Sequence, residues 1–175
     1  MSTTSQCMLA HSADGDVCTW KDKADAFAEA GYRVLAIQSN GADPEEITAA
    51  TAVLRDKGVR SVALMGASKG GTGALVAAAD IEPAVHAVVP LSAPRAYSGM
   101  NAESAVPRLT VPLLYVAAEL DGKFPADAEA LHALTARAPE KKLEIVAGSQ
   151  HGEPVLDVAA NWKLVLDFLD AHPAS

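Results

Sequence analysis

The sequence has few of the residues that bind metals or form cross-links. Cysteine occurs only at Cys7 and Cys18 among 175 residues, and neither a CxxC nor an HExxH spacing is present. The five histidines are scattered, which disfavours a metal site. The N-terminal stretch MSTTSQCMLAHSADGD has no basic segment followed by an apolar one, so we expect no secretion signal. The sequence therefore predicts two reduced thiols and no metal or cofactor.

Basic residues and long apolar runs are also scarce. The chain has 14 Lys and Arg against 22 Asp and Glu, which gives a formal net charge of -8. Binding to nucleic acid requires clustered Lys and Arg, so this balance argues against DNA or RNA as the main partner. No apolar run approaches the roughly 20 residues that a membrane-spanning helix needs. We therefore expect a cytoplasmic protein that acts on a small molecule, with neither nucleic acid nor membrane as partner.

What the chain does contain is an alternation of short apolar runs with longer helical patterns. These runs include VLAI, VALM, AVVPL and LLYVAA, and they are typical of strands buried on both faces of a parallel sheet. Strands are predicted at Gln6–Ala10, Arg33–Gln38, Ser61–Met65, His86–Leu91, Pro112–Ala118 and Lys142–Ala147. Helices are predicted at Val17–Ala30, from Pro44 to a stop at Gly58, and at Lys69–Ala79, Ala126–Arg137 and Glu153–Ala171. The pattern predicts an α/β fold in one domain over residues 1–175. It is a three-layer sandwich with a mostly parallel sheet of about six strands flanked by helices.

One helix start and one connection are distinctive. Asp43 is a preferred N-cap residue, Pro44 suits the first helical position, and Glu46 stands where a capping box places its acid. The segment Ser92–Thr110, in contrast, has no helical or strand period. A connection of that length in a compact domain is often functional. We expect it to form either a small cap over a site or simply a long connection.

The stretch VALMGASKGGTGALVAAA, residues 62–79, carries the main motif. It does not match a phosphate-binding loop, because Lys69 precedes Gly70 and Val76 stands where GxGxxG needs its third glycine. The pentapeptide GASKG instead matches G-x-S-x-G after a buried strand and before a helix, which is the context of a nucleophile elbow. Flanking glycines permit the sharp turn that lifts the Ser68 hydroxyl out of the sheet. The alternative is an ordinary glycine-rich turn whose serine caps the helix.

A nucleophilic Ser68 requires a base to accept its proton and an acid to orient that base. In folds that use this elbow, the acid and then the histidine follow the serine, at the carboxyl ends of strands. His151 directly follows a predicted strand, in KKLEIVAGSQHG. Asp121 ends PLLYVAAELD, after the preceding strand, with Glu119 as the fallback acid. The other later histidines are His86 at a strand start, His132 within a helix and His172 in the C-terminal tail.

The same chemistry requires N–H donors for the developing oxyanion. The N–H of Lys69, the residue after the nucleophile, is one expected donor, and the second comes from the loop after the first strand. That loop reads HSADG at residues 11–15. In it we predict the Ala13 N–H as the donor, with the Ser12 N–H less favoured.

These motifs together resemble the α/β-hydrolase superfamily, in its small, lid-poor branch near dienelactone-hydrolase-like and esterase-like members. The resemblance rests on CMLAHSADGD, GASKGG, AAELDGKFP and GSQHG, which follow one another in that order over nearly the whole chain. The sequence departs from the family in three ways. It starts almost at the oxyanion-loop strand, without the usual preceding hairpin. Ser12 replaces the usual glycine of the oxyanion loop. Ser68 replaces the cysteine of dienelactone hydrolases proper.

The resemblance implies a serine hydrolase for a carboxylic ester or thioester, acting through an acyl-enzyme. Non-hydrolytic chemistry of the lyase or cofactor-free haloperoxidase type is the alternative, as is a ligand-binding module with a degenerate site. The Lys69 side chain has two interpretations. It is either a surface residue paired with a carboxylate or a cation that attracts an anionic substrate. The sequence leaves the natural substrate and the oligomeric state open.

Overall fold

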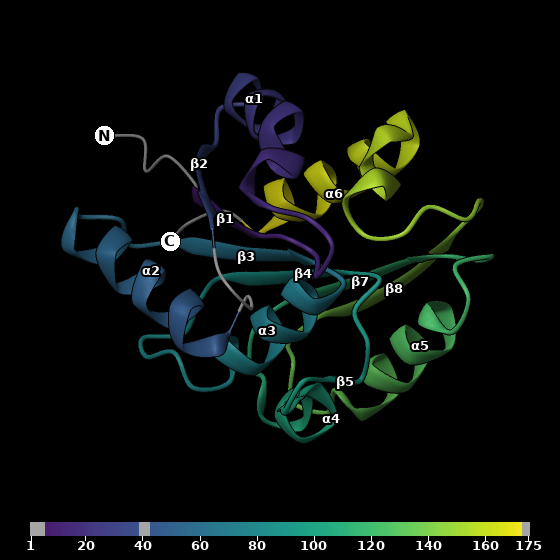
Figure 1. Ribbon diagram of the computed structural model, residues 1–175. Coiled ribbons are helices and arrows are strands. Elements are labelled where there is room, and N and C mark those ends of the chain that lie inside the picture. Colours follow the sequence, from purple (N-terminus) through teal and green to yellow (C-terminus); the bar gives the residue numbers. More distant parts are fainter. Residues whose placement is uncertain (1–5, 39–42, 173–175) are drawn as a thin grey trace.

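The computed structural model describes residues 6–38 and 43–172, and its centre is a six-stranded sheet (Figure 1). The strands are β1 (Gln6–Ala10), β2 (Arg33–Ile37), β3 (Val62–Ala67), β4 (Ala87–Leu91), β7 (Leu113–Ala118) and β8 (Lys141–Val146). All neighbouring strands pair in parallel, in the order β2-β1-β3-β4-β7-β8. The sheet predicted from the apolar runs is therefore confirmed.

The strand order changes direction between β1 and β3. From β1 the chain moves outward to β2, and it then crosses back to β3 and continues through β4, β7 and β8. In open α/β sheets, a crevice forms at the carboxyl ends of the strands where the order reverses. The loop after β1 and the GASKG turn at the end of β3 lie on the two sides of that point, since Ala10 pairs with Gly66.

Helices cover both faces of the sheet (Figure 1). On one face lie α1 (Lys21–Glu29) and α6 (Ala159–Ala171), and on the other lie α2 (Pro44–Asp56), α3 (Lys69–Ala78) and α5 (Phe124–Leu134). Short 3₁₀ turns precede two of these helices, η1 (Val17–Trp20) before α1 and η3 (Glu153–Asp157) before α6. The three predicted layers are therefore present.

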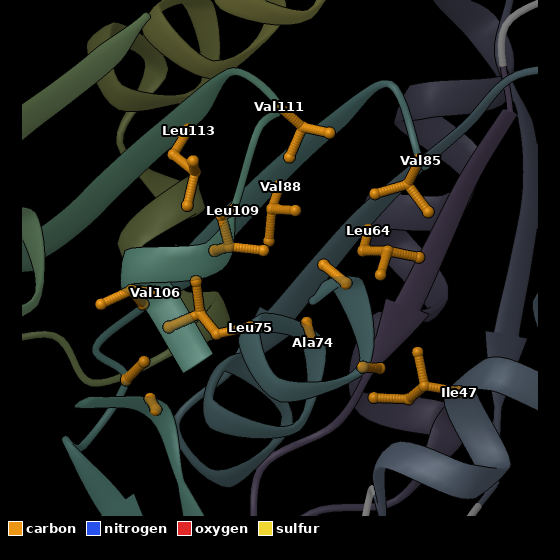
Figure 2. Packing of buried hydrophobic residues seen from close by; sticks show 14 of the residues in the cluster. Ile47, Leu64, Ala74, Leu75, Val85, Val88, Val106, Leu109, Val111 and Leu113 are labelled. Carbon is orange, nitrogen blue, oxygen red and sulfur yellow. The ribbon is translucent and has the colours of Figure 1, made fainter. Parts of the chain in front are cut away.

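The core consists of two apolar clusters, one on each face of the sheet. On β3, Val62 and Leu64 belong to one cluster, while Ala63 and Met65 belong to the other. Successive side chains of a strand point to opposite faces, so a strand covered on both sides is apolar at every position. Figure 2 shows the first cluster, in which Leu64 lies near residues of α2 and α3. Burying one such leucine contributes about 1.5–3 kcal/mol.

The long connection after β4 is structured. It forms the two-stranded hairpin of β5 (Ala96–Tyr97) and β6 (Met100–Asn101), then α4 (Ala102–Ala105) and the 3₁₀ turn η2 (Val106–Arg108). Val106 and Leu109 are buried in the cluster on the α3 face, which anchors the segment to the core. The connection is therefore a packed insertion beside α3 rather than an open loop.

Several predicted boundaries shift. The helix predicted at Val17–Ala30 is a 3₁₀ turn followed by α1, and the one predicted at Glu153–Ala171 is divided at Val158. Asp43 occupies the N-cap position of α2, but its side chain makes no capping hydrogen bond. The Glu46 N–H donates to the Asp43 backbone carbonyl instead, at 3.0 Å, so this half of the predicted capping box is wrong.

Two expectations about thiols and membranes can be compared with the structure. Cys7 and Cys18 are both free thiols, the first buried and the second exposed. Burial raises the pKa of Cys7 to about 12, which keeps this thiol protonated. Within residues 6–38 and 43–172, no helix has the length and apolar character needed to cross a membrane.

Candidate active site

Ser68 lies at a strained turn between β3 and α3. Its backbone has φ 50° and ψ -116°, a conformation that residues other than glycine seldom adopt. A Cβ on Gly66 would lie 2.1 Å from the Gly70 carbonyl oxygen, so the turn excludes any side chain there. Ser68 occupies the N-cap position of α3, yet its side chain makes no capping bond. The alternative of a helix-capping serine therefore has no support in the geometry.

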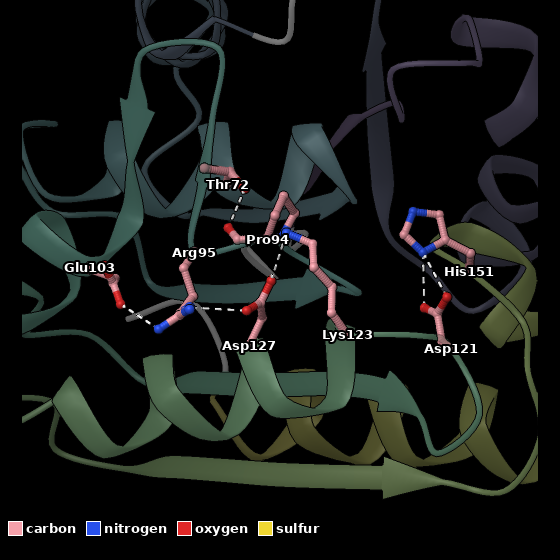
Figure 3. A network of polar contacts seen from close by, with 8 residues as sticks. All are labelled: Thr72, Pro94, Arg95, Glu103, Asp121, Lys123, Asp127 and His151. Carbon is pink, nitrogen blue, oxygen red and sulfur yellow. Dashed lines mark hydrogen bonds and ion pairs between the residues drawn. The ribbon is translucent and has the colours of Figure 1, made fainter.

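Asp121 and His151 form a hydrogen-bonded pair (Figure 3). His151 Nδ1 lies 2.9 Å from Oδ2 and 3.1 Å from Oδ1 of Asp121. The Asp121 carboxylate is buried, whereas the imidazole is about a third exposed. Glu119, the fallback acid, is exposed and contributes only its backbone N–H, which donates to the Val146 carbonyl at 2.8 Å. The predicted acid and base are therefore hydrogen-bonded to each other, and the Glu119 side chain takes no part in this pair.

The His151 loop lies against the turn that carries Ser68. A Cβ on Gly152 would lie 3.1 Å from the Ala67 Cβ and 4.0 Å from the Ser68 N. In the described part of the chain, no hydrogen bond joins the Ser68 hydroxyl to the His151 ring. Such contacts are often long before substrate binds and tighten in the complex. The three predicted residues therefore lie together at the carboxyl ends of the strands. The contact between Asp121 and His151 is formed, and the contact between Ser68 and His151 is not.

Solved structures share this architecture. A dienelactone hydrolase from Anabaena variabilis matches with a TM-score of 0.81 and 22% identity, over 98% of this chain and 88% of that chain. MenH from S. aureus matches with a TM-score of 0.80 and 14% identity, over 98% and 96%. An esterase from Pyrococcus furiosus matches with a TM-score of 0.84 and 12% identity, over 98% and 83%. The chain has the α/β-hydrolase fold. No protein-family model matches the sequence, and no curated protein does.

In this α/β-hydrolase fold, the loop after β1 packs against the start of α3. A Cβ on Gly70 would lie 2.4 Å from the Ala10 carbonyl oxygen and 2.7 Å from that of His11. Lys69, whose N–H is the first predicted oxyanion donor, begins α3, and the N–H groups of a first helical turn point out of the helix end. Ser12 and Ala13 follow on the facing loop, where the Ser12 carbonyl accepts a bond from Gly15 N at 3.3 Å. The predicted donors therefore lie on adjacent segments.

The Lys69 side chain points toward the insertion after β4. Its Nζ lies over the Tyr97 ring, 5.8 Å from the centroid, and Tyr97 belongs to the β5–β6 hairpin. A cation over an aromatic face is attracted by the ring quadrupole. The hairpin of this α/β-hydrolase fold thus reaches the residue that follows the candidate nucleophile.

Sequence reasoning missed two residues that support the His151 loop. Ser92, directly after β4, is fully buried with φ 49°, and its Oγ accepts a 3.1 Å bond from Gly152 N. Phe124, at the start of α5, packs on the imidazole with ring centroids 4.2 Å apart. The only sequence signal was position, since Ser92 directly follows a buried strand and Phe124 lies three residues after Asp121. Among the described residues, no group of three or more His, Cys, Asp or Glu is placed to hold a metal.

Proposed function

We propose that the protein is a serine hydrolase that cleaves a carboxylic ester or a thioester through an acyl-enzyme intermediate. The observation that carries this proposal is the Asp121–His151 pair beside a serine in a strained backbone conformation. Strain at a residue other than glycine persists only where the surrounding structure enforces it, and it is concentrated at functional sites. A helix-capping or surface serine would not need such a turn.

The hydrogen bond between His151 and Asp121 fixes how the imidazole acts. In the neutral ring, Nδ1–H donates to the Asp121 carboxylate, so Nε2 carries the lone pair that accepts a proton. In the proposed reaction, His151 takes the Ser68 proton as Oγ attacks the substrate carbonyl carbon. The carboxylate stabilises the imidazolium that forms, without itself becoming protonated.

The remaining steps follow from the same groups. The N–H groups of Lys69 and Ala13, with Ser12 as the less favoured second donor, stabilise the oxyanion of the tetrahedral intermediate. His151 then gives its proton to the departing alcohol or thiol, which leaves the acyl group on Ser68. Water, activated by the same imidazole, attacks the acyl-enzyme and releases the acid. These steps need no metal and no organic cofactor.

A fluorophosphonate probe tests for an activated serine. We expect it to label the wild-type protein and not Ser68→Ala, and we expect His151→Ala to slow labelling by at least about a hundredfold. Ser104→Ala, on α4, is the matched control and keeps wild-type labelling. Circular dichroism establishes that each variant is folded.

A panel of p-nitrophenyl esters and acyl thioesters then separates the reaction classes. Turnover with a pre-steady-state burst of p-nitrophenol supports the acyl-enzyme route. Labelling without turnover of any ester or thioester favours a lyase or haloperoxidase type of reaction on the same fold. Absence of labelling in folded wild-type protein contradicts the proposal and favours a ligand-binding role.

A further inference from the structure

The edge strand β2 carries apolar side chains that the fold covers only in part. Figure 1 shows β2 at the end of the sheet, between α1 and α2, and among residues 6–38 and 43–172 only β1 pairs with it. Residues 34–37 of β2 are partly buried, whereas every residue of β1 is buried. The N–H and C=O groups on the outer side of β2 therefore have no strand partner within these residues.

The opposite edge of the sheet is protected against a further strand. β8 carries Lys141, Lys142 and Glu144, and charged side chains on an edge strand oppose pairing with another chain. β2 has one charged residue, Arg33, at its first position. The two edges therefore differ in sequence, and the edge at β2 lacks the charges that would keep another strand away.

A groove of about 660 Å³ lies beside the first three residues of β2. Its walls come from α1 and α2, which cover opposite faces of the sheet (Figure 1). Its apolar lining is contributed by all three elements: Ala24 and Ala28 of α1, Val34 and Leu35 of β2, and Val53 and Leu54 of α2. The Val53 side chain is 50% exposed. The groove therefore presents apolar surface on both sides of the strand.

Two exposed cations line the same groove. Arg33 begins β2, Lys57 follows α2, and in the part of the chain that the structure describes neither side chain has a hydrogen bond or an ion pair. The acid that lines the groove, Asp25, is bound by Lys21 at 2.7 Å. Asp56, the residue before Lys57, lines a different cavity. In a chain with a net charge of -8, this groove therefore carries positive charge that an anionic group can neutralise.

The backbone edge, the apolar walls and the cations restrict what can bind in the groove. A purely aliphatic chain would cover the outer N–H and C=O groups of β2 and leave them without hydrogen bonds. A polar strand would place unpaired polar groups against the apolar walls. An extended peptide meets both conditions, because its backbone bonds the strand edge and its alternate side chains contact the two walls. The two cations favour a carboxylate on that peptide.

We propose that the outer edge of β2 binds an extended, apolar segment of a partner protein, antiparallel to β2, with an acidic side chain beside Arg33 and Lys57. Antiparallel pairs are slightly more stable than parallel ones. In that direction the C-terminal end of the segment lies at the start of β2, so the acidic residue stands near that end. The groove lies toward the amino ends of the strands, whereas Ser68 lies at their carboxyl ends, so this binding does not depend on hydrolysis.

Selection from a displayed library of random peptides tests the proposal. Peptides retained by the wild-type protein should share a run of β-branched residues that ends in Asp or Glu. Fluorescence anisotropy then gives the Kd of a selected peptide. We expect Arg33→Met and Lys57→Met each to raise this Kd about two- to fivefold, and Val53→Lys to raise it at least about tenfold. A peptide whose acid is replaced by its amide should bind the wild-type protein and the methionine variants equally.

Matched control variants remove the same kinds of groups elsewhere. Arg137→Met removes an exposed cation after α5, and Leu134→Lys replaces an apolar residue of α5 that is 42% exposed. Both variants should keep the wild-type Kd. Hydrogen exchange locates the bound peptide, because binding should slow the exchange of the β2 amides that do not bond β1 and leave the amides of β8 unchanged. Circular dichroism establishes that each variant is folded.

Three results would overturn the proposal. The first is a selection that yields no peptide, or only peptides that bind the Arg33→Met, Lys57→Met and Val53→Lys variants as tightly as the wild-type protein. The second is displacement of the peptide by decanoate at equal affinity, which would assign the groove to an aliphatic acid without backbone groups. The third is a wild-type dimer in sedimentation equilibrium that Val53→Lys dissociates, because a second copy of the chain would then cover the edge.

Discussion

Gly152 N donates a 3.1 Å hydrogen bond to the Oγ of Ser92, which joins the loop of the candidate base to the end of β4. The bond is buried, and Ser92 N itself donates to the Val116 carbonyl at 2.8 Å. One serine therefore links β4, β7 and the loop after β8. Since Gly152 directly follows His151, this bond anchors the backbone beside the imidazole to the end of β4.

Replacing Ser92 by alanine should loosen the base. Ser92→Ala leaves the Gly152 N–H without its buried partner, which costs about 1–3 kcal/mol of unfolding free energy. We expect kcat to fall more than KM rises, because the His151 loop loses its fixed position. Urea denaturation and ester kinetics measure the two effects, with Ser104→Ala as a surface control. Wild-type kcat in a destabilised Ser92→Ala protein would show that the bond is structural only.

Removing the ring of Phe124 should disturb the imidazole more directly. The two rings are 4.2 Å apart and tilted by 48°, so Phe124 limits the orientations open to His151. Phe124→Ala is expected to lower kcat by about ten- to a hundredfold, as misplaced catalytic groups commonly do. Phe124→Leu keeps apolar contact and should retain most of the rate. Equal kinetics for the leucine and alanine variants would argue against a positioning role.

A single methyl group on Gly70 should disrupt the site. The Cβ of Gly70→Ala would lie 2.4 Å from the Ala10 carbonyl oxygen. The other nearest atoms also belong to the backbone, so no side chain can move to make room. The end of β1 must shift, which costs about 1–3 kcal/mol and moves the loop with the predicted oxyanion donors. Gly31→Ala is the control, because its Cβ meets open space and its φ of 93° carries only conformational strain. Chemical denaturation and kcat together distinguish the two variants. We expect Gly31→Ala to lose stability and keep its kcat, and Gly70→Ala to lose both stability and kcat.

Acid should weaken the fold through His86. Burial lowers the pKa of this histidine below its ordinary value of 6.5, and neither ring nitrogen has a hydrogen-bond partner in the described part of the chain. The unfolded chain therefore binds a proton near pH 6.5 that the folded protein resists. Above that pH the histidine is neutral in both states and imposes no penalty on folding. As the pH falls below it, protonation favours the unfolded chain, so the free energy of unfolding decreases.

Replacing His86 by phenylalanine should flatten that dependence. We compare the change in unfolding free energy between pH 7.5 and pH 5.5 in wild-type and His86→Phe proteins. A constant packing cost of the larger ring cancels in this difference. An identical pH dependence in both proteins would mean that other groups govern acid stability.

The strands could be predicted from sequence because their signal is local. Every residue of β3 is buried, and the run VALMGA shows this directly. The end of α5 could not be predicted in the same way. The helix was expected to run to Arg137, but it ends at Leu134, where Thr135 Oγ1 bonds the Leu131 carbonyl at 2.8 Å and lies 2.6 Å from the Tyr115 hydroxyl. That contact joins residues 20 positions apart, so periodicity within the helix carries no sign of it.

The same distinction, between local signals and contacts of residues far apart in the sequence, applies to the candidate site. The pairing of Asp121 with His151 could be predicted because each residue follows a strand in a fixed order after Ser68. Ser92, Phe124 and the ring of Tyr97 act across loops that only folding brings together, and each is an unremarkable residue in its own segment. The hydroxyl–imidazole contact that the order of residues predicts remains a prediction.

The segregation of all site loops to one edge of the sheet has a practical consequence. The turns at the opposite edge, such as those at Gly31 before β2 and Gly58 before β3, lie at the amino ends of the strands. A surface linker or a fused partner attached there would hold the protein with its candidate site facing the solution. Because all six strands run in parallel, their amino ends lie together on the side of the molecule that is suited to attaching a linker or a fused partner.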